Sequence, residues 1–251
     1  FKKKLFYTKR IINGQEVTVP RFFRVSPDLF YDENLMLEIL KVLLPLKAGV
    51  FIDIGVNLGQ TLAKVKTIDP QQEYIGFECN PLCHHYAQEL IRINAYPAAL
   101  LMPVGVSNKT DILTLYSDYV TDSASSLVPG FRESEKYSMK QFVPVFVGDY
   151  LIDFLKPQNI SIIKVDVEGG ELEVIEGLRK TMQQYRPIFL CEILPTKDTK
   201  GDVQQFRKER KDKILRLILN QRYVIYELSQ EGKIIKLDMN RSVMSEDFRN
   251  H

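Results

Sequence analysis

Short apolar runs alternate with longer stretches of helical spacing between residues 50 and 193. Each run is too short for a helix and is bounded by turn residues, which favours a buried strand. Apolar residues that recur every three or four positions predict the intervening helices, one of which begins at Pro81 with Asn80 as its N-cap. Such alternation predicts a parallel sheet covered on both faces. The expected strands are 50–54, 74–77, 100–106, 160–165 and 188–191.

Three regions depart from this alternation. Residues 1–48 contain one amphipathic helix that ends at Pro45, and residues 108–147 replace a helix with strand-like pieces around a serine-rich stretch. Near the end, two apolar runs flank a polar turn at 229–232, which predicts a hairpin over 223–237. We therefore expect an N-terminal extension over 1–48 and one domain over 49–251 that carries an insertion at 108–147.

Composition narrows the class of protein. The chain has 251 residues, 45% of them hydrophobic, and its net charge is +2. A length of this order suits one large domain, and the near-zero charge gives no reason to expect nucleic acid as a partner. The longest apolar run, 98–104, is far below the roughly 18 residues needed to cross a membrane. Three cysteines suit a reducing compartment, so we expect a cytoplasmic protein, and a chain that begins at Phe1 leaves room for a longer native N-terminus.

The most informative segment joins the first expected strand to its helix. The strand ends in Asp53, Gly55 and Gly59 follow in a tight loop, and a helix opens near Gln60 with free backbone N–H groups. Glu78 closes the next strand, where an acid can accept hydrogen bonds from both hydroxyl groups of a ribose. The segment therefore predicts a nucleotide site at the carboxyl ends of the strands.

The kind of nucleotide follows from charge. A dinucleotide loop has the pattern G-x-G-x-x-G, whereas this loop reads G-x-N-x-G and is preceded by a carboxylate. A carboxylate would repel a pyrophosphate but would attract an ammonium or a sulfonium group. S-adenosylmethionine carries both, so it is favoured over NAD.

At this point the sequence resembles the FkbM-type S-adenosylmethionine-dependent methyltransferases. The residues that carry the resemblance lie in order along residues 50 to about 195, and the block that begins at Lys164 is the most specific of them. One departure is Cys79, where the family more often has proline. The blocks read FIDIGVNLGQT (51–61), IGFECNP (75–81), PVGVSN (103–108), IIKVDVEGGELEVIEGL (162–178) and, more weakly, RPIFLCEI (186–193).

The resemblance implies an α/β class I methyltransferase fold, Rossmann-like, with a mostly parallel seven-stranded sheet that ends in an antiparallel hairpin. It implies a hydroxyl acceptor on a sugar or a natural-product-like small molecule, and S-adenosylhomocysteine as the product. It also implies a set of site residues. The methionine part of the cofactor would be lined by Asp53, Gly55, Asn57 and Gly59, and the ribose would be held by Glu78. The adenine would lie by Val106 and Ser107, and the methyl group next to Asp166. The expected cofactor site is completed by Gln60, Thr61 and Asn80.

Transfer of a methyl group to an alcohol also needs a base to remove the proton. Asp166 or Glu168 could take that role. Glu168 is equally well explained as a first-turn acid favoured by the helix dipole, and for Glu171 that explanation is the better one. A second option is a divalent ion held by Asp166 and Glu192, which would lower the pKa of the acceptor hydroxyl. Most strand-end carboxylates bind no metal, so the metal-free reading is preferred.

Other patterns have simpler explanations. A cluster of possible zinc ligands is formed by Cys79, Cys83, His84 and His85, but no second Cys/His pair in the sequence completes a zinc site. We therefore expect a helix start with histidines that face solvent. The stretch 122–127 fits a lid over the cofactor and a solvated loop equally well. The basic stretch 197–216 predicts the exposed face of a helix that buries Ile214, Leu215, Leu217 and Ile218.

Two other functions stay open from the sequence alone. An NAD-type oxidoreductase is disfavoured by the glycine spacing, and a non-catalytic cofactor-binding protein would keep the same binding residues. Residues 1–48 and 108–147 are expected to cap the acceptor pocket. Specificity would then lie in the segments that the resemblance does not cover.

Overall fold

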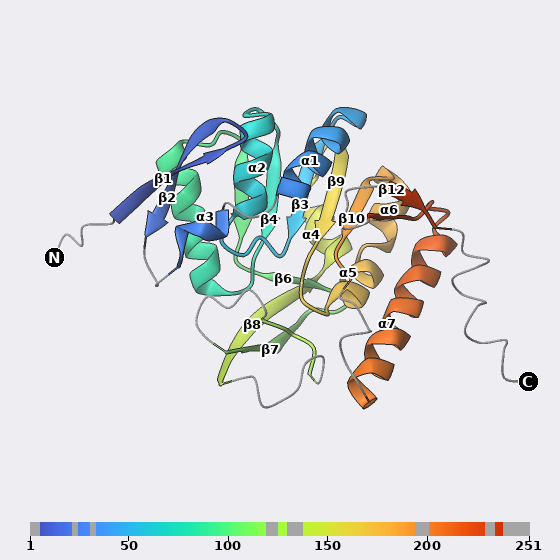
Figure 1. Ribbon diagram of the computed structural model, residues 1–251. Coiled ribbons are helices and arrows are strands. Elements are labelled where there is room, and N and C mark those ends of the chain that lie inside the picture. The colour runs from blue at the N-terminus through green and yellow to red at the C-terminus, as the bar shows by residue number, and fades with distance from the viewer. Residues whose placement is uncertain are drawn as a thin grey trace, which may run out of the picture.

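The computed structural model describes residues 6–21, 25–30, 34–118, 125–129, 138–193, 201–228 and 234–237. At its centre lies a five-stranded sheet in which every neighbouring pair is parallel (Figure 1). Side by side the strands are β10 (Ile188–Cys191), β9 (Ile160–Val165), β3 (Val50–Ile54), β4 (Tyr74–Phe77) and β5 (Ala99–Met102). If these five strands are counted in chain order and read from β5 to β10, the order is 3-2-1-4-5. This is the Rossmann order, and it confirms the predicted parallel α/β sheet.

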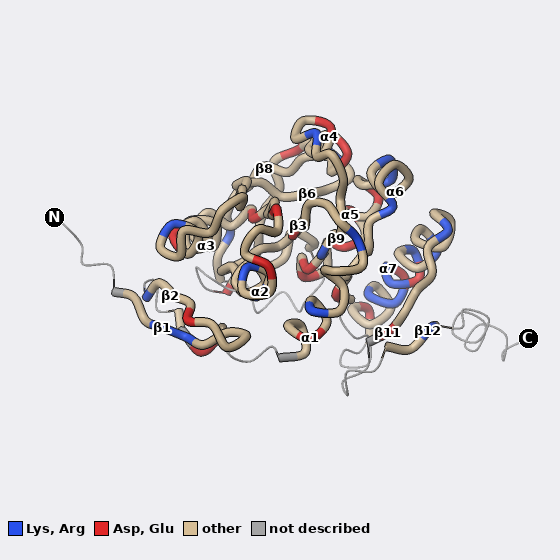
Figure 2. Tube along the Cα trace, turned by 90° about the horizontal axis from the view of Figure 1, so that it is seen from above, with Lys and Arg blue, Asp and Glu red and all other residues tan. Residues whose placement is uncertain are grey.

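Helices cover both faces of this sheet, as Figure 2 shows for α1 and α2 on one side of β3 and β9 and α4 on the other. One face packs against α1 (Asn34–Leu43), η2 (Leu44–Leu46), α2 (Gln60–Ile68), α3 (Pro81–Asn94) and the strands β1 (Phe6–Ile12) and β2 (Gln15–Arg21). The other face packs against α4 (Gly148–Leu155), α5 (Glu171–Gly177), α6 (Arg179–Tyr185) and α7 (Gly201–Asn220).

The central strand β3 is buried along its whole length. Phe51 packs into the cluster on the α1–α3 face, whereas Ile52 and Ile54 pack into the cluster on the α4–α7 face. Because side chains alternate along a strand, Asp53 points to the same face as Phe51. The strand order reverses between β3 and β9, and ligands of such sheets bind outside the carboxyl ends of the strands at that point.

The N-terminal extension contains more than the one expected helix. The expected helix is present as α1, but an antiparallel hairpin of β1 and β2 precedes it, followed by the short η1 (Pro27–Phe30). The hairpin forms because Val17 and Val19 alternate with polar residues and are 2% and 0% exposed, and because Asn13 and Gly14 supply a turn with positive φ at both positions. It is fixed to α3 by Asn94, which bonds to both backbone groups of Thr18.

The expected strand 100–106 is divided at Pro103, which has no N–H group for a sheet ladder. The second part, β6 (Gly105–Ser107), leaves the central sheet and joins β7 (Asp111–Ser117) and β8 (Met139–Val147) in a three-stranded sheet of order β6-β8-β7. The two strand-like pieces expected in the insertion lie within β7 and β8. The single helix expected after residue 171 is divided at Leu178 into α5 and α6, and α4 was not predicted.

The predicted seven-stranded sheet is not confirmed. In the described ranges, β11 (Tyr226–Leu228) pairs antiparallel with β12 (Ile234–Lys236), but the two strands form a separate sheet and begin three residues after the expected start at Tyr223. Helix α7 buries Ile214, Leu215 and Ile218, as its spacing predicted, while Leu217 is half-buried. No helix in the described part is both long and apolar enough to span a membrane.

Candidate active site

A cavity of about 1110 Å³ opens at the carboxyl ends of β3, β4 and β9, where the strand order reverses. Most of the residues expected from the sequence meet there. Two of them, Asp53 and Gly59, do not line it. The expected residues that do line it are Gly55, Asn57, Gln60, Thr61, Glu78, Asn80, Val106, Ser107, Asp166, Glu168 and Glu192.

The loop after β3 is held close to the end of β9. Gly55 has a φ of 90°, and a Cβ atom at this position would lie 1.8 Å from the carbonyl oxygen of Asp166. Only glycine fits such a close approach in this backbone conformation. Asn57 follows with a φ of 51°, and its side-chain Oδ1 is buried without a hydrogen-bond partner among the described residues. A polar atom of this kind at a cavity wall is a place where a ligand donor fits.

Glu78 lies at the end of β4, and its carboxylate organises this part of the wall. One carboxylate oxygen accepts a hydrogen bond from the backbone N–H of Asn57 and the other from that of Asn80, both at 2.7 Å. The side chain is 8% exposed, and burial raises its pKa to about 7. Each oxygen keeps a further lone pair, so the carboxylate can still accept two hydroxyl groups from a ligand.

Two of the expected cofactor residues, Gly59 and Asn80, are N-caps of helices. Gly59 is the left-handed N-cap of α2, and a Cβ there would lie 2.8 Å from a methyl carbon of Leu90, so the glycine lets α2 pack against α3. Gly59 does not line the cavity, and its expected place beside the cofactor stays a prediction. Asn80 caps α3, as predicted, because its Oδ1 accepts from the N–H groups of Leu82 and Cys83.

His84 departs from its expected exposure. Its side chain is half-buried with Nε2 shielded from solvent, and burial lowers its pKa, whereas His85 is exposed as predicted. Within the described ranges no three or more His, Cys, Asp or Glu side chains are grouped as a metal site would require. Asp166 and Glu192, the pair considered for a metal, both line the cavity.

Asp53 lies beneath the cavity rather than in its wall, because its side chain is turned into the α1–α3 face and is 0% exposed. The Tyr74 hydroxyl donates to its Oδ2 at 2.5 Å, and the Lys164 ammonium lies 3.4 Å from its Oδ1. Lys164 also donates to Asp166 at 3.1 Å. Burial alone would lower the pKa of Lys164, but the two aspartates hold it above its ordinary value. Lys164 thus lies between the carboxylates of Asp53 and Asp166, and the expected attraction between Asp53 and a cofactor ammonium stays a prediction.

Lys164 was not predicted as a site residue, although it begins the most specific block. Its signal was a lone lysine in an otherwise apolar strand, where a charge needs a partner.

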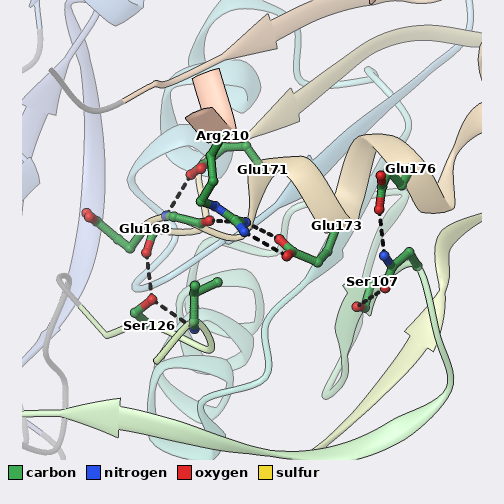
Figure 3. Close-up of polar contacts among 10 residues, drawn as sticks. Ser107, Ser126, Glu168, Glu171, Glu173, Glu176 and Arg210 are labelled. Carbon is green, nitrogen blue, oxygen red and sulfur yellow. Dashed lines mark hydrogen bonds and ion pairs between the residues drawn. The ribbon is translucent and has the colours of Figure 1, made fainter. Parts of the chain in front are cut away.

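The turn after β9 carries Glu168 and is held by side chains from distant segments (Figure 3). Ser126, from the insertion, donates to the carbonyl oxygen of Glu168 at 2.7 Å, and Arg210, from α7, donates to the carbonyl oxygen of Gly169 at 2.7 Å. Arg210 also forms an ion pair with Glu173. These bonds maintain a φ of 51° at Glu168, which a residue with a side chain rarely adopts.

Two acids near this turn differ in their surroundings. Glu171 is 4% exposed, accepts from the Gly169 N–H at 2.9 Å, and has its pKa raised by burial. Its expected role as a simple first-turn acid omits this bond. Glu168 lines the cavity, half-buried, on the same side as Asp166.

Val106 and Ser107 form the wall contributed by β6. A Cβ atom at Gly177 would lie 2.0 Å from the Ser107 carbonyl oxygen, so the end of α5 packs directly on this strand. The next residue, Asn108, donates to Glu176 at 2.6 Å, as Figure 3 shows beside Ser107. This part of the wall is therefore rigidly attached to the helix that follows the Glu168 turn.

Segments outside the central alternation close the rest of the cavity. Its outer wall includes Val25, Leu29 and Met36 from the N-terminal region, and Ile112 and Leu127 from the insertion. Ser126 is 0% exposed, so the interpretation of its stretch as a solvated loop is wrong at that residue, and residues 122–124 lie outside the described ranges.

Comparison with known proteins gives one family. The profile described as Methyltransferase FkbM domain matches residues 53–225. Methyltransferase sdnD of Sordaria araneosa is 26% identical over 153 residues, covering 51% of this chain and 59% of that protein. The chain thus matches less than two thirds of the length of this relative.

Solved structures share only a distant likeness. The precorrin-6y C5,15-methyltransferase of Geobacter metallireducens is 11% identical with a TM-score of 0.42, covering 77% of this chain and 73% of that one. The methyltransferase PaMTH1 of Podospora anserina, bound to S-adenosylhomocysteine, is 12% identical with a TM-score of 0.41, covering 81% and 76%. The family profile matches well over half of the chain, across the strands that build the cavity. The chain therefore belongs to the FkbM methyltransferase domain family.

Proposed function

We propose that the protein is an S-adenosylmethionine-dependent O-methyltransferase that acts on a hydroxyl group of a sugar or natural-product-like small molecule. The observation that carries the proposal is the cavity at the sheet reversal, which is lined by Glu78 and Gly55 together with Asp166 and Glu168. The carboxylate proposed to bind the ribose and the carboxylates proposed to accept a proton thus line the same cavity. Nothing in the described residues favours the NAD-type alternative.

The cavity fits the cofactor in three respects. Glu78 presents two carboxylate oxygens where a ribose diol can donate, and Val106 supplies an apolar wall for the adenine. Asn57 presents an Oδ1 that has no hydrogen-bond partner among the described residues. Gln60 and Thr61 begin α2 at the edge of the cavity, next to free N–H groups of the helix. When bound, S-adenosylmethionine supplies an electrophilic methyl group on its sulfonium.

The chain itself supplies a proton acceptor. Asp166 and Glu168 both line the cavity, so either carboxylate can remove the proton from an acceptor hydroxyl. The backbone that carries Glu168 is fixed, since Ser126 bonds to the carbonyl oxygen of Glu168 and Arg210 to that of Gly169. Fixed groups are effective because they hold the reacting atoms in line at little cost in entropy.

The acceptor is proposed to lie against the outer wall. Val25, Leu29 and Met36 face the cavity from one side, and Ile112 and Leu127 face it from the other. This arrangement supports the expectation that residues 1–48 and 108–147 cap the acceptor. A cavity of about 1110 Å³ exceeds the upper end of the common range for one small ligand, about 1,000 Å³, which leaves room for two.

The test is methyl transfer from labelled S-adenosylmethionine to paired acceptors, each offered with its hydroxyl free and with the same oxygen already methylated. We expect label only in the free member of a pair, and at least a hundredfold lower kcat in Glu168→Gln or Asp166→Asn, as is typical when a general base is removed. Cofactor binding without transfer to any acceptor would favour the non-catalytic alternative. Loss of activity with EDTA would favour the Asp166 and Glu192 metal option.

A further inference from the structure

Three charged side chains form a row at the base of the cavity. Asp53 is 0% exposed and does not line the cavity, while Lys164, 4% exposed, and Asp166 both line it. The Asp166 side chain is 32% exposed, so its carboxylate is the accessible end of the row. Two carboxylates and one ammonium leave the row with a net negative charge.

Among the described residues, Asp53 accepts a hydrogen bond on Oδ2 only, and its buried Oδ1 has no hydrogen-bond partner but forms an ion pair with Lys164. Oδ2 accepts from the Tyr74 hydroxyl at 2.5 Å, and the Tyr74 ring is stacked on Phe51 with 5.7 Å between centroids. Oδ1 lies 3.4 Å from Lys164, which lies between it and Asp166. A ligand in the cavity therefore meets Lys164 and Asp166 before it can reach Asp53.

Asp166 also lies beside the loop where the methionine part is expected. Its carbonyl oxygen occupies the space that a Gly55 side chain would take, and its backbone N–H donates to Ile54. An ammonium group placed at this loop would find an accessible carboxylate in Asp166. The Asp166 carboxylate attracts an ammonium group in the cavity, whereas the Lys164 ammonium, which lies between Asp53 and Asp166, repels it from Asp53.

We propose that Asp166 is the acid that faces the cofactor ammonium, and that Asp53 and Lys164 are positioning residues that hold its carboxylate in place. The inference rests on the proposed cofactor and leaves Glu168 as the base for the acceptor hydroxyl. It assigns the contact with the cofactor ammonium, which was expected for Asp53, to Asp166, which lies 113 residues later in the sequence.

The test compares two probes on the full chain by calorimetric titration. S-adenosylhomocysteine carries the amino-acid part, and 5′-methylthioadenosine lacks it. The ratio of their affinities isolates contacts to the amino-acid part, since a general structural defect weakens both probes alike. Binding to the unaltered chain tests the cofactor itself, so failure of the proposed function would be seen before any variant is made.

Three variants separate the alternatives. We expect Asp166→Asn to lower the ratio about tenfold, and Asp53→Asn to lower it less than about threefold, since the carboxamide keeps an oxygen for Lys164. The double variant Asp53→Asn/Lys164→Met leaves no uncompensated buried charge, which favours folding. It should lower the ratio as far as Asp166→Asn does, because the Lys164 ammonium that donates to the Asp166 carboxylate is then missing.

Three results would overturn the proposal. A tenfold loss in Asp53→Asn with an unchanged ratio in Asp166→Asn would mean that Asp53 itself contacts the ammonium. A wild-type ratio in the double variant would mean that Lys164 positions nothing. As a conservative control, Lys164→Arg keeps the cation and should retain the ratio to within about threefold; a tenfold loss there would show that packing, not charge, is responsible.

Discussion

Glu78 makes cofactor binding depend on pH. Its carboxylate must be ionised to accept two ribose hydroxyl groups, yet burial raises its pKa to about 7. Below that pH the free protein holds a proton on Glu78 that the ligand must displace. Affinity for S-adenosylhomocysteine should therefore rise with pH and level off above about 7.

The magnitude follows from the fraction of ionised Glu78. With a pKa of about 7, roughly 3% of the carboxyl is ionised at pH 5.5 and roughly 90% at pH 8. Affinity should therefore increase about thirtyfold over this range, which corresponds to about 2 kcal/mol. Isothermal titration calorimetry at several pH values measures it, with Glu78→Gln as the control that binds weakly and shows no such rise.

A flat affinity in the unaltered chain, or the same rise in Glu78→Gln, would refute the assignment of Glu78 to the ribose. The stability of the free protein gives an independent check. A carboxyl whose pKa is raised on folding stabilises the fold below its ordinary value of 4.5, and this contribution is lost as the pH rises through about 7. The loss is on the order of 3 kcal/mol and should appear in urea titrations between these pH values, but not in Glu78→Gln.

Two further predictions concern the walls of the cavity. Gly55→Ala should destabilise the fold by more than about 2 kcal/mol in urea titrations, because its Cβ would lie 1.8 Å from the Asp166 carbonyl oxygen at a φ of 90°. The control Gly14→Ala meets no atom within 4 Å and should cost only about 1–2 kcal/mol. Equal losses of stability in the two variants would contradict the close approach. Arg210→Met should lower the free energy of unfolding by about 1.5–3 kcal/mol, since it removes charge-assisted bonds from a side chain that is only 11% exposed. The control Lys211→Met, on the exposed face of α7, should change stability by less than about 0.5 kcal/mol. Equal effects in the two variants would mean that the Arg210 contacts contribute nothing.

The parallel sheet and the ends of its strands could be predicted because each depends on local pattern. Strand β3 is a continuous apolar run, and Glu78 follows the next such run directly. Strand ends fix where polar side chains meet, since parallel strands share one carboxyl edge. For that reason Glu78, Asn57 and Asp166 could all be assigned to one cavity from their positions in the chain.

The contacts of Asp53 could not be predicted, because they involve partners that are distant in the sequence. Position alone placed it at a strand end, but the alternation of side chains in β3 turned it toward Tyr74 and Lys164. The same reason explains Ser126 and Arg210, whose bonds to the Glu168 turn join segments that are about 40 residues apart. Such contacts are set by tertiary packing and have no local signal.

Two of the differences between the expected and the observed fold have local signals in the sequence. Asn13 and Gly14 form a common hairpin turn between alternating residues, and this pattern indicated β1 and β2. Pro103 indicated the break between β5 and β6, since proline cannot donate to a central ladder. The separate sheet of β11 and β12 depends on pairing in space, and neither strand's sequence specifies it.

The most direct test of the whole account is a crystal structure of the full chain with S-adenosylhomocysteine. We expect the nucleoside in the cavity at the sheet reversal, with both ribose hydroxyl groups within hydrogen-bonding distance of Glu78 and the adenine against Val106. A ligand bound elsewhere, or one that leaves Glu78 without a contact, would contradict the site and with it the proposed chemistry.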